Sequence, residues 1–424
     1  MTMGLRAMVR LFAFLNLGTG RSGRIAVLAA SCLVIPSAVR AQATLIRATN
    51  PPEWGTNPQL VEEVRIGSVL GPEEYSLGSV GDVVVGSDGS IWVADLHASL
   101  IRRYDADGRA MPSIGRRGDG PGEFRYPAKM RTLPNGSVAI WDNGRGRVTV
   151  VSPEGAYQYS FPVGSGLITS RLREEFEVDR NGYLYILESN LRELAGDPTQ
   201  VVDQSFLARL SAAIDEGYRL RWIKLDPHGS VLESIPIAPS RPNRIVDPVR
   251  TLEVLSPLGY VVSARNDEYA FHLGDASDSI VRIERPWNDI RYRRAERAEK
   301  QRLENAFAPR NDRRPENIPA TKPVFKRFSI DRQGRLWVEL HAPGHRESET
   351  EGEQARRERF DGFEQEWREP LIYEVVSAAG SFLGAVEFPN RQTEIMVASG
   401  QLVWVVEWGP FDEQYVVRYR IVHG

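Results

Sequence analysis

Two successive segments of this chain, 83–115 and 130–161, follow one pattern of apolar runs and glycine turns. In each, a short apolar run leads to a glycine turn, then to two alternating runs, and ends at a second glycine turn. The two glycines are 19 residues apart in both copies. They are Gly89 and Gly108 in the first copy, and Gly136 and Gly155 in the second. A repeat of about 40–50 residues that holds four short strands is typical of one blade of a β-propeller.

Weaker copies of the first turn continue along the chain, so that six blades are expected. Glycine suits these turns because a tight hairpin connection needs a positive φ. The turn glycines are Gly89, Gly136, Gly182, Gly259, Gly334 and Gly400. The second turn recurs at Gly108, Gly155, Gly229, near Asp278 and at Gly380. We therefore predict an all-β fold over residues 59–424, a six-bladed β-propeller of four-stranded antiparallel blades with short helical insertions.

The sixth blade is one strand short where the sequence ends. Its apolar runs are 394–399, 401–408 and 415–423, whereas an alternating segment, 59–68, precedes the first full blade. A strand from the N-terminal side that completes the last blade would hide two sheet edges and join the two ends of the chain. We therefore expect residues 59–68 to close the ring.

The first 41 residues have the features of a secretory signal. Four arginines precede the apolar run 25–35, and small residues follow it up to Ala41, after which cleavage is expected. Residues 42–58 then form an N-terminal linker. An uncleaved signal segment that anchors the protein in the membrane is less favoured, because the apolar run is short for a bilayer. Lipid attachment at Cys32 is also less favoured, because the apolar run continues past this residue. We expect an exported protein, periplasmic or extracellular.

Composition narrows the possible partners. Cys32 is the single cysteine, so the mature chain would have no disulfide and would depend on packing. A formal net charge of −3 gives no reason to expect nucleic acid or an anionic membrane as partner. No later segment is long and apolar enough to cross a membrane.

Three insertions, 190–219, 286–320 and 341–369, interrupt the blade pattern. The first has apolar residues at helical spacing. In the second, 290–305 predicts a helix ending before Pro309, either a solvated helix bridging blades four and five or a basic site for acidic ligands. The third is rich in Glu and Arg and is expected to be a mobile flap.

The propeller geometry assigns these insertions to one face. If the strands of a blade are lettered a to d outward from the axis, the short glycine turns are the a–b and c–d connections. The b–c loops and the linkers between blades then share the opposite face, which we call the long-loop face. Elaborate loops on a rigid scaffold are where binding usually occurs, so this face is the expected binding surface.

The linker between the first two blades resembles a known family. It reads GRRGDGPGEF from Gly115 to Phe124, and is similar to the linker of NHL-repeat six-bladed propellers, a group common among secreted bacterial proteins. The strand that follows keeps Asp142 and Arg147 of the NHL pattern. The resemblance implies a fold, since propellers of this kind host ligand-binding modules and several unrelated enzymes. A phosphate-binding role for the glycines is less favoured, because no helix follows them.

Polar residues recur at the predicted ends of the b strands, on the long-loop face. With nearby polar and aromatic residues they form the candidate ligand site: Asp95, His97, Asp142, Asn143, Glu188, Arg265, Glu339, His341, Glu407 and Trp408. If the carboxylates converge, Asp95, Asp142 and Glu188 would be ligands for a calcium-type ion, which needs about six to eight oxygens. Metal-dependent lactonases with six blades use comparable sets. The favoured alternative is structural, with each carboxylate accepting hydrogen bonds from its own b–c loop.

Two further residue types bear on this site and on the core. His97 and His341 both follow b-strand ends, which leaves a zinc site conceivable, although lone histidines on separate loops are more often surface residues. The tryptophans inside the b strands are expected to pack one blade against the next. They are Trp92, Trp141, Trp337 and Trp404.

The sequence therefore predicts a binding or protein-interaction module that uses its long-loop face. Its partner would be a protein, peptide or carbohydrate ligand of the cell envelope, with no resident cofactor. No G-x-S-x-G turn occurs in the mature chain, so no catalytic residue is assigned. The alternative is a metal-dependent hydrolase, lactonase or lyase with a calcium-type ion at the channel mouth.

Overall fold

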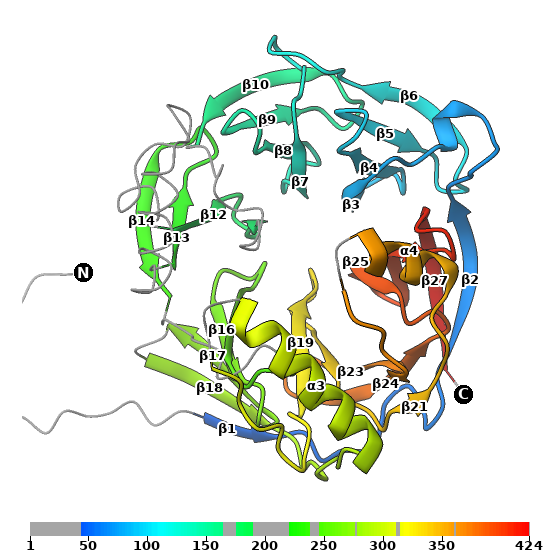
Figure 1. Cartoon of the computed structure of the whole chain (residues 1–424). Helices are drawn as coiled ribbons and strands as arrows, with labels where there is room; N and C mark the ends of the chain where they lie inside the picture. Colours follow the sequence, from blue (N-terminus) through cyan, green and yellow to red (C-terminus); the bar gives the residue numbers. More distant parts are fainter. Residues whose placement is uncertain are drawn as a thin grey trace, which may run out of the picture. The chain divides into compact units, whose positions relative to one another are not determined.

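The computed structural model describes residues 44–163, 175–189, 220–237, 246–275, 278–310, 314–359 and 362–423. The strands of these residues form six four-stranded antiparallel blades around a central axis, as predicted (Figure 1). The predicted signal peptide, 1–41, and the first insertion, 190–219, lie outside the described residues.

Each blade is a meander whose strands run outward from the axis in the order a, b, c, d. Blade one is β3 (Val80–Val85), β4 (Ile91–Asp95), β5 (Leu100–Tyr104) and β6 (Ala110–Ile114). Blade two is β7 (Pro127–Thr132), β8 (Val138–Asp142), β9 (Arg147–Val151) and β10 (Tyr157–Pro162). Blade three is β11 (Phe176–Val178), β12 (Leu184–Ser189), β13 (Leu220–Leu225) and β14 (Val231–Pro236).

Blades four to six repeat this order. Blade four is β15 (Thr251–Leu255), β16 (Val261–Arg265), β17 (Ala270–Asp275) and β18 (Asp278–Glu284). Blade five is β19 (Phe325–Ile330), β20 (Leu336–Leu340), β23 (Leu371–Val376) and β24 (Phe382–Phe388). Blade six is β25 (Thr393–Ser399), β26 (Leu402–Trp408), β27 (Gln414–Val422) and β2 (Gln59–Ile66).

The N-terminal strand closes the last blade, as the sequence predicted. β2 pairs antiparallel with β27, with Leu60 opposite Ile421 and Ile66 opposite Val416. Val64 and Ile66 are buried, and they pack in a hydrophobic cluster with Trp404 between blades six and one. The closure therefore joins β2 to the C-terminal strand β27 by backbone hydrogen bonds and by core packing.

A further strand lies in the segment that was expected to be a linker. β1 (Thr44–Arg47) adds to blade four by pairing parallel with β18. A few residues later, the backbone N–H of Trp54 donates to the carbonyl of Leu383 at 2.8 Å, and its side chain is buried between blades five and six. Four residues are too few to show alternation in a sequence, so β1 could not be predicted from it.

The hydrophobic core lies between neighbouring blades. The tryptophans of the b strands occupy these interfaces, which confirms their predicted role as packing residues. They are Trp92, Trp141, Trp337 and Trp404, each at most 3% exposed. All six a–b turn glycines have positive φ, as the turn type requires.

Two helices and a short ribbon lie over blades four to six, on the long-loop face seen in Figure 1. α3 (Arg294–Arg310) runs through Pro309 instead of ending before it. Its buried residues include Glu296, Leu303 and Glu304, so α3 is not the solvated helix expected. The predicted flap contains α4 (Glu351–Arg359) between two paired strands, β21 (His345–Arg346) and β22 (Trp367–Arg368). A 3-10 turn, η1 (Glu73–Tyr75), precedes blade one.

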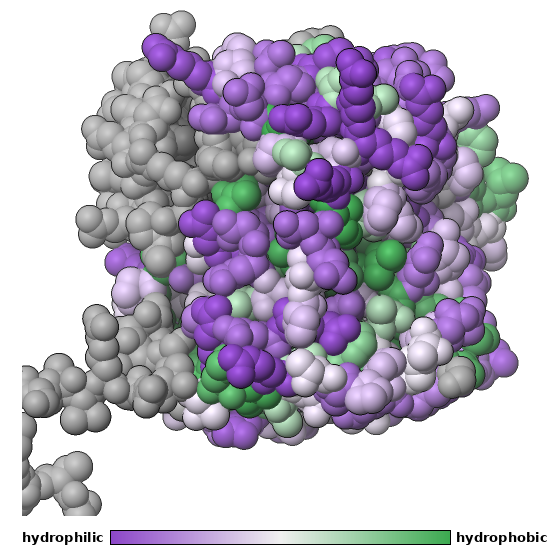
Figure 2. Space-filling view, turned by 90° about the horizontal axis from the view of Figure 1, so that it is seen from below, coloured by the Kyte–Doolittle hydropathy of each residue, from purple (hydrophilic) through white to green (hydrophobic). Residues whose placement is uncertain are grey.

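The outside of the ring is mainly hydrophilic, with hydrophobic atoms in separate small patches, in the side view of Figure 2. Within the described residues, neither helix has the length and apolar character that a membrane crossing requires.

Candidate functional site

Asp95 and Asp142 occur at the predicted b-strand ends, where both are buried and hold backbone in place. Asp95 accepts hydrogen bonds from the backbone N–H of Ala98, at 3.0 Å, and from Nε of Arg102, at 2.8 Å. Asp142 accepts from the N–H groups of Arg125, at 3.0 Å, and Tyr126, at 2.8 Å. These two carboxylates therefore fasten loops of the long-loop face.

In blade four, a neighbour of the predicted residue fastens the loops. Arg265 is exposed and pairs with Asp267 at 2.8 Å. The next residue, Asn266, is buried; its Oδ1 accepts from the N–H of Arg250 at 2.8 Å, and its Nδ2 donates to the carbonyls of Pro248 and Phe325. The sequence pattern did not indicate Asn266, because it lies one position beyond the register of Asp142.

The three glutamates at this register are each paired with an arginine. Glu188 and Arg221 lie opposite each other on β12 and β13, at 2.8 Å. Glu339 is buried and accepts hydrogen bonds from Arg327 at 2.5 Å and from the Tyr373 hydroxyl at 3.2 Å. Burial alone would raise the pKa of Glu339, but Arg327 and Lys326 lower it below its usual value.

Glu407 is also buried, and its partners come from its own blade. It accepts from Arg65 of β2 at 2.9 Å and from the Tyr419 hydroxyl at 2.6 Å. Trp408, beside it, is half-buried and packs against the cluster between blades six and one. It is therefore a packing residue rather than an exposed ligand contact.

The predicted ligands do not come together around one point. Within the described ranges, no three His, Cys, Asp or Glu side chains are grouped so that they could hold a metal ion. His97 is exposed on blade one, whereas His341 is buried and donates through Nδ1 to Glu369 at 3.1 Å. The five carboxylates of the predicted site, Asp95, Asp142, Glu188, Glu339 and Glu407, form ion pairs or anchor loops.

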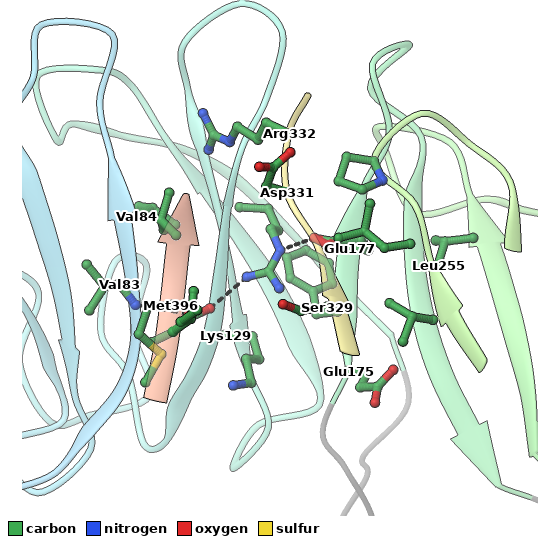
Figure 3. Close-up of a pocket in the computed structure, with 18 of the residues that line it drawn as sticks. Val83, Val84, Lys129, Glu175, Glu177, Leu255, Ser329, Asp331, Arg332 and Met396 are labelled. Carbon is green, nitrogen blue, oxygen red and sulfur yellow. Dashed lines mark hydrogen bonds and ion pairs between the residues drawn. The ribbon is translucent and has the colours of Figure 1, made fainter. Parts of the chain in front are cut away.

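A cavity of about 920 Å³ occupies the central channel of the described residues. Residues of all six a strands line it, and of the ten predicted site residues it includes Asn143 alone. Each a strand begins at the long-loop face and ends at a glycine turn. The position of a residue along its a strand therefore tells how far into the channel it lies from the long-loop face. In Figure 3, Lys129 and Glu175 lie toward the long-loop end, Glu177 in the middle, and Arg332 at the turn end.

Arg131 links three blades across the wall of this channel. It contacts Asp82 of β3 at 2.8 Å and also contacts Glu177 of β11 (Figure 3). Burial alone would lower the pKa of Arg131, but the two carboxylates raise it, so the guanidinium stays charged. Burial raises the pKa of Glu177, although Arg131 opposes that shift.

The insertions are docked on the ring by buried charges. The Lys322 side chain is fully buried, and its Nζ contacts Glu296 of α3, Glu369 at 2.6 Å and the carbonyl of Ala342 at 2.7 Å. Burial would raise the pKa of Glu369, but the His341 hydrogen bond and the two nearby lysines lower it well below its usual range. Removal of one partner from such a buried cluster destabilises a protein by about 3–5 kcal/mol. The cluster therefore attaches α3 and the 341–369 insertion, together called the platform, rigidly to the ring.

Other glutamates of α3 bind main-chain N–H groups. Glu299 accepts from the N–H of Glu366 at 2.8 Å, and Glu304 accepts from the N–H of Val246 at 2.9 Å. These contacts explain the burial of an acidic helix face that looked solvated in the sequence.

A second cavity, of about 220 Å³, lies between α3 and the 341–369 insertion. Two of its cations pair with carboxylates of the same lining: Lys300 with Asp247 at 3.5 Å, and Lys326 with Glu369 at 3.2 Å. Arg391 pairs with Glu353 at 2.7 Å. The cavity is therefore less suited to an acidic ligand than the channel.

The channel residues do have a signal in the sequence, although it was not among those used to predict the site. Charged residues alternate with apolar ones in inner strands that should otherwise be apolar, as in Lys129-Met130-Arg131 and Glu175-Phe176-Glu177. In a propeller, such positions can face only the axis or a neighbouring blade.

Comparisons with known proteins give likeness in architecture only. No family model matches the chain, and no curated protein matches it. A candidate exported protein of Bacteroides fragilis is 9% identical, with 90% of this chain and 99% of that one covered and a TM-score of 0.46. A member of the DUF4221 family from Bacteroides vulgatus is 10% identical, with 86% of this chain and 98% of that one covered and a TM-score of 0.45. A virginiamycin B lyase from Staphylococcus aureus is 12% identical, with 85% of this chain and 99% of that one covered and a TM-score of 0.38.

At these identities and scores the comparisons carry no argument about activity. The strand order and pairing within the chain itself identify the described residues as a six-bladed β-propeller.

Proposed function

We propose that this chain is an exported binding module that takes a small polar ligand, or the end of a peptide or carbohydrate chain, into its central channel. The ligand would enter from the long-loop face. The observation that carries this proposal is the channel of about 920 Å³, whose long-loop end is lined by charged side chains of four different blades. These are Lys129, Glu175, Arg327 and Glu394. A concave site with a few convergent polar groups is the usual form of a small-molecule site.

The rigid platform of α3 and the 341–369 insertion supports the same proposal. It extends the long-loop face beyond blades four to six and would add contacts for the part of a ligand that stays outside the channel. Export by the signal peptide and membership of the NHL-type group belong to this proposal, because a propeller of that group would meet its ligand in the cell envelope.

A channel-filling variant tests the proposal. Ser329 lies on β19, lines the channel and is exposed to it, so Ser329→Trp would occupy the space without entering the core. Ser113→Trp, on the exposed outer strand β6, is the matched control. We expect at least one of glucose, a dipeptide, succinate and inorganic phosphate to raise the melting temperature of the wild type and of Ser113→Trp, but not of Ser329→Trp. A ligand that still stabilises Ser329→Trp would place binding outside the channel.

The metal-dependent alternative makes a different prediction for the same preparation. A hydrolase or lyase that uses Asp95, Asp142 and Glu188 would contain a stoichiometric metal, and EDTA would lower its melting temperature. A binding module of the proposed kind would show neither effect.

A further inference from the structure

At the turn end of the channel lies an arginine, Arg332, that has no counter-ion among the described residues. Arg332 follows Asp331 in the β19–β20 turn, and its exposed side chain lines the channel. Among the residues that the structure describes, no hydrogen-bond acceptor or carboxylate lies within bonding distance of its guanidinium. Its neighbour Asp331 is already occupied, because it accepts from Arg335 at 2.5 Å and from Nε1 of Trp337 at 2.9 Å.

The charges around Arg332 do not neutralise it. Partial desolvation by the surrounding ring and repulsion from Arg131 lower the pKa of Arg332, and Glu177 only partly opposes this. Glu177 itself is bound by Arg131. A guanidinium that has lost part of its hydration beside a second guanidinium is destabilised, and a bound anion would remove that cost.

The wall around this end of the channel is mainly apolar, although Thr132 and Asp331 also line it. Val84, Leu255 and Ala398 stand at or next to the turn ends of their strands and line the channel there. A ligand at this depth would therefore meet one cationic group, Arg332, in a mainly hydrocarbon surface. A planar guanidinium pairs best with a carboxylate or a phosphate, which can accept two parallel hydrogen bonds.

We propose that the turn end of the channel is an anion subsite, in which Arg332 binds a carboxylate or phosphate group of a small ligand. This inference rests on the proposed function, since it names the chemistry of the ligand that the channel takes. Arg131 supports the subsite through its charge while it remains bound to Asp82 and Glu177.

The experiment compares two arginines at equivalent turn positions. Arg180 precedes Asn181-Gly182 in blade three, as Arg332 precedes Gln333-Gly334 in blade five, and it is exposed and does not line the channel. Succinate and inorganic phosphate are titrated by calorimetry into the mature wild type, Arg332→Gln and Arg180→Gln. We expect Arg332→Gln to weaken binding about tenfold to hundredfold, because a hydrogen bond to a charged group is lost, and Arg180→Gln to change it less than twofold. Arg332→Lys should be intermediate, because it keeps the charge but not the paired donors.

The two anions separate the two ligand classes. Tighter binding of succinate supports a carboxylate ligand, and tighter binding of phosphate supports a phosphorylated one. Binding of neither anion to the wild type, or equal loss in Arg332→Gln and Arg180→Gln, would overturn the subsite. A neutral ligand that binds the wild type and fails with Ser329→Trp would then leave the channel function standing without the anion subsite.

Discussion

Single residues of this propeller serve either the packing between blades or the fastening of loops. Gly115 is a clear case of packing, because it has φ of 76° and an added Cβ would lie 2.5 Å from Cε2 of the buried Phe124. The linker motif that resembles NHL repeats is thus explained by a close approach of backbone and ring. Phe124 itself is 0% exposed and packs in the cluster between blades one and two.

We predict that Gly115→Ala destabilises the protein by at least about 1 kcal/mol more than Gly400→Ala. Both glycines have positive φ, so both variants carry the backbone penalty of about 1–2 kcal/mol. A Cβ added at Gly400 would meet no atom within 4 Å, so Gly400→Ala lacks the steric clash. Equal free energies of unfolding in urea titration would show that the contact with Phe124 contributes nothing.

For the predicted site residues, the sequence correctly indicated their positions at the strand ends, but not the side chains with which they form hydrogen bonds or ion pairs. Asp95, Asp142, Glu339 and Glu407 lie where the register placed them, and their burial could be anticipated from their position in apolar strands. Their partners, such as Arg65 for Glu407, come from segments distant in the chain. No local pattern predicts such a pairing.

At the scale of elements, α4 shows how a highly charged segment becomes ordered. Thr350 and Glu353 form a capping box, with the N–H of Glu353 donating to Oγ1 of Thr350 at 3.2 Å and the N–H of Thr350 donating to Glu353 at 3.0 Å. Glu353 also pairs with Arg391 at 2.7 Å, which connects α4 to the linker before β25. The sequence composition suggested a flap, whereas these contacts form a defined helix on the ring.

We predict an acid-sensitive contribution of Glu353 to stability. Burial alone would raise its pKa, but the hydrogen bonds from Arg391 and Thr350 lower it to about 2 from the usual 4.5. The folded pKa lies below the unfolded one, so this stabilisation is present above about pH 4.5 and is lost as the pH falls toward 2. Between pH 6 and 3, the melting temperature of the wild type should fall more steeply than that of Glu353→Gln. Parallel curves for the two proteins would contradict the assignment.

At the scale of the whole molecule, the closure of the ring by β2 is the feature on which stability should depend most. A propeller whose last blade combines β2 with the three C-terminal strands must bring these distant segments together to fold. β2 supplies hydrogen bonds to β27 and the buried Val64 and Ile66. β1, in contrast, covers only the outer edge of blade four.

Deletion of Leu60 to Ser68 should lower the melting temperature by about 10 °C or more, because it removes core side chains and exposes the edge of β27. Deletion of residues 44–47, which removes β1, is the control and should have a clearly smaller effect. Differential scanning calorimetry of both variants makes the comparison, and an unchanged melting temperature after the first deletion would refute closure by β2 as a source of stability.

Local sequence patterns were sufficient to establish the number of blades, the positions of their turns, the tryptophans between them and the closing strand. These features depend on alternation along a strand and on the positive φ of a hairpin turn, and both are determined by residues that are adjacent in the sequence. The folded ring was needed to show that Arg131 joins Asp82 to Glu177, that α3 buries its glutamates, and that Arg332 lacks a counter-ion among the described residues. Each of these depends on which side chains of separate blades share one space, and the ring brings them together only when it closes.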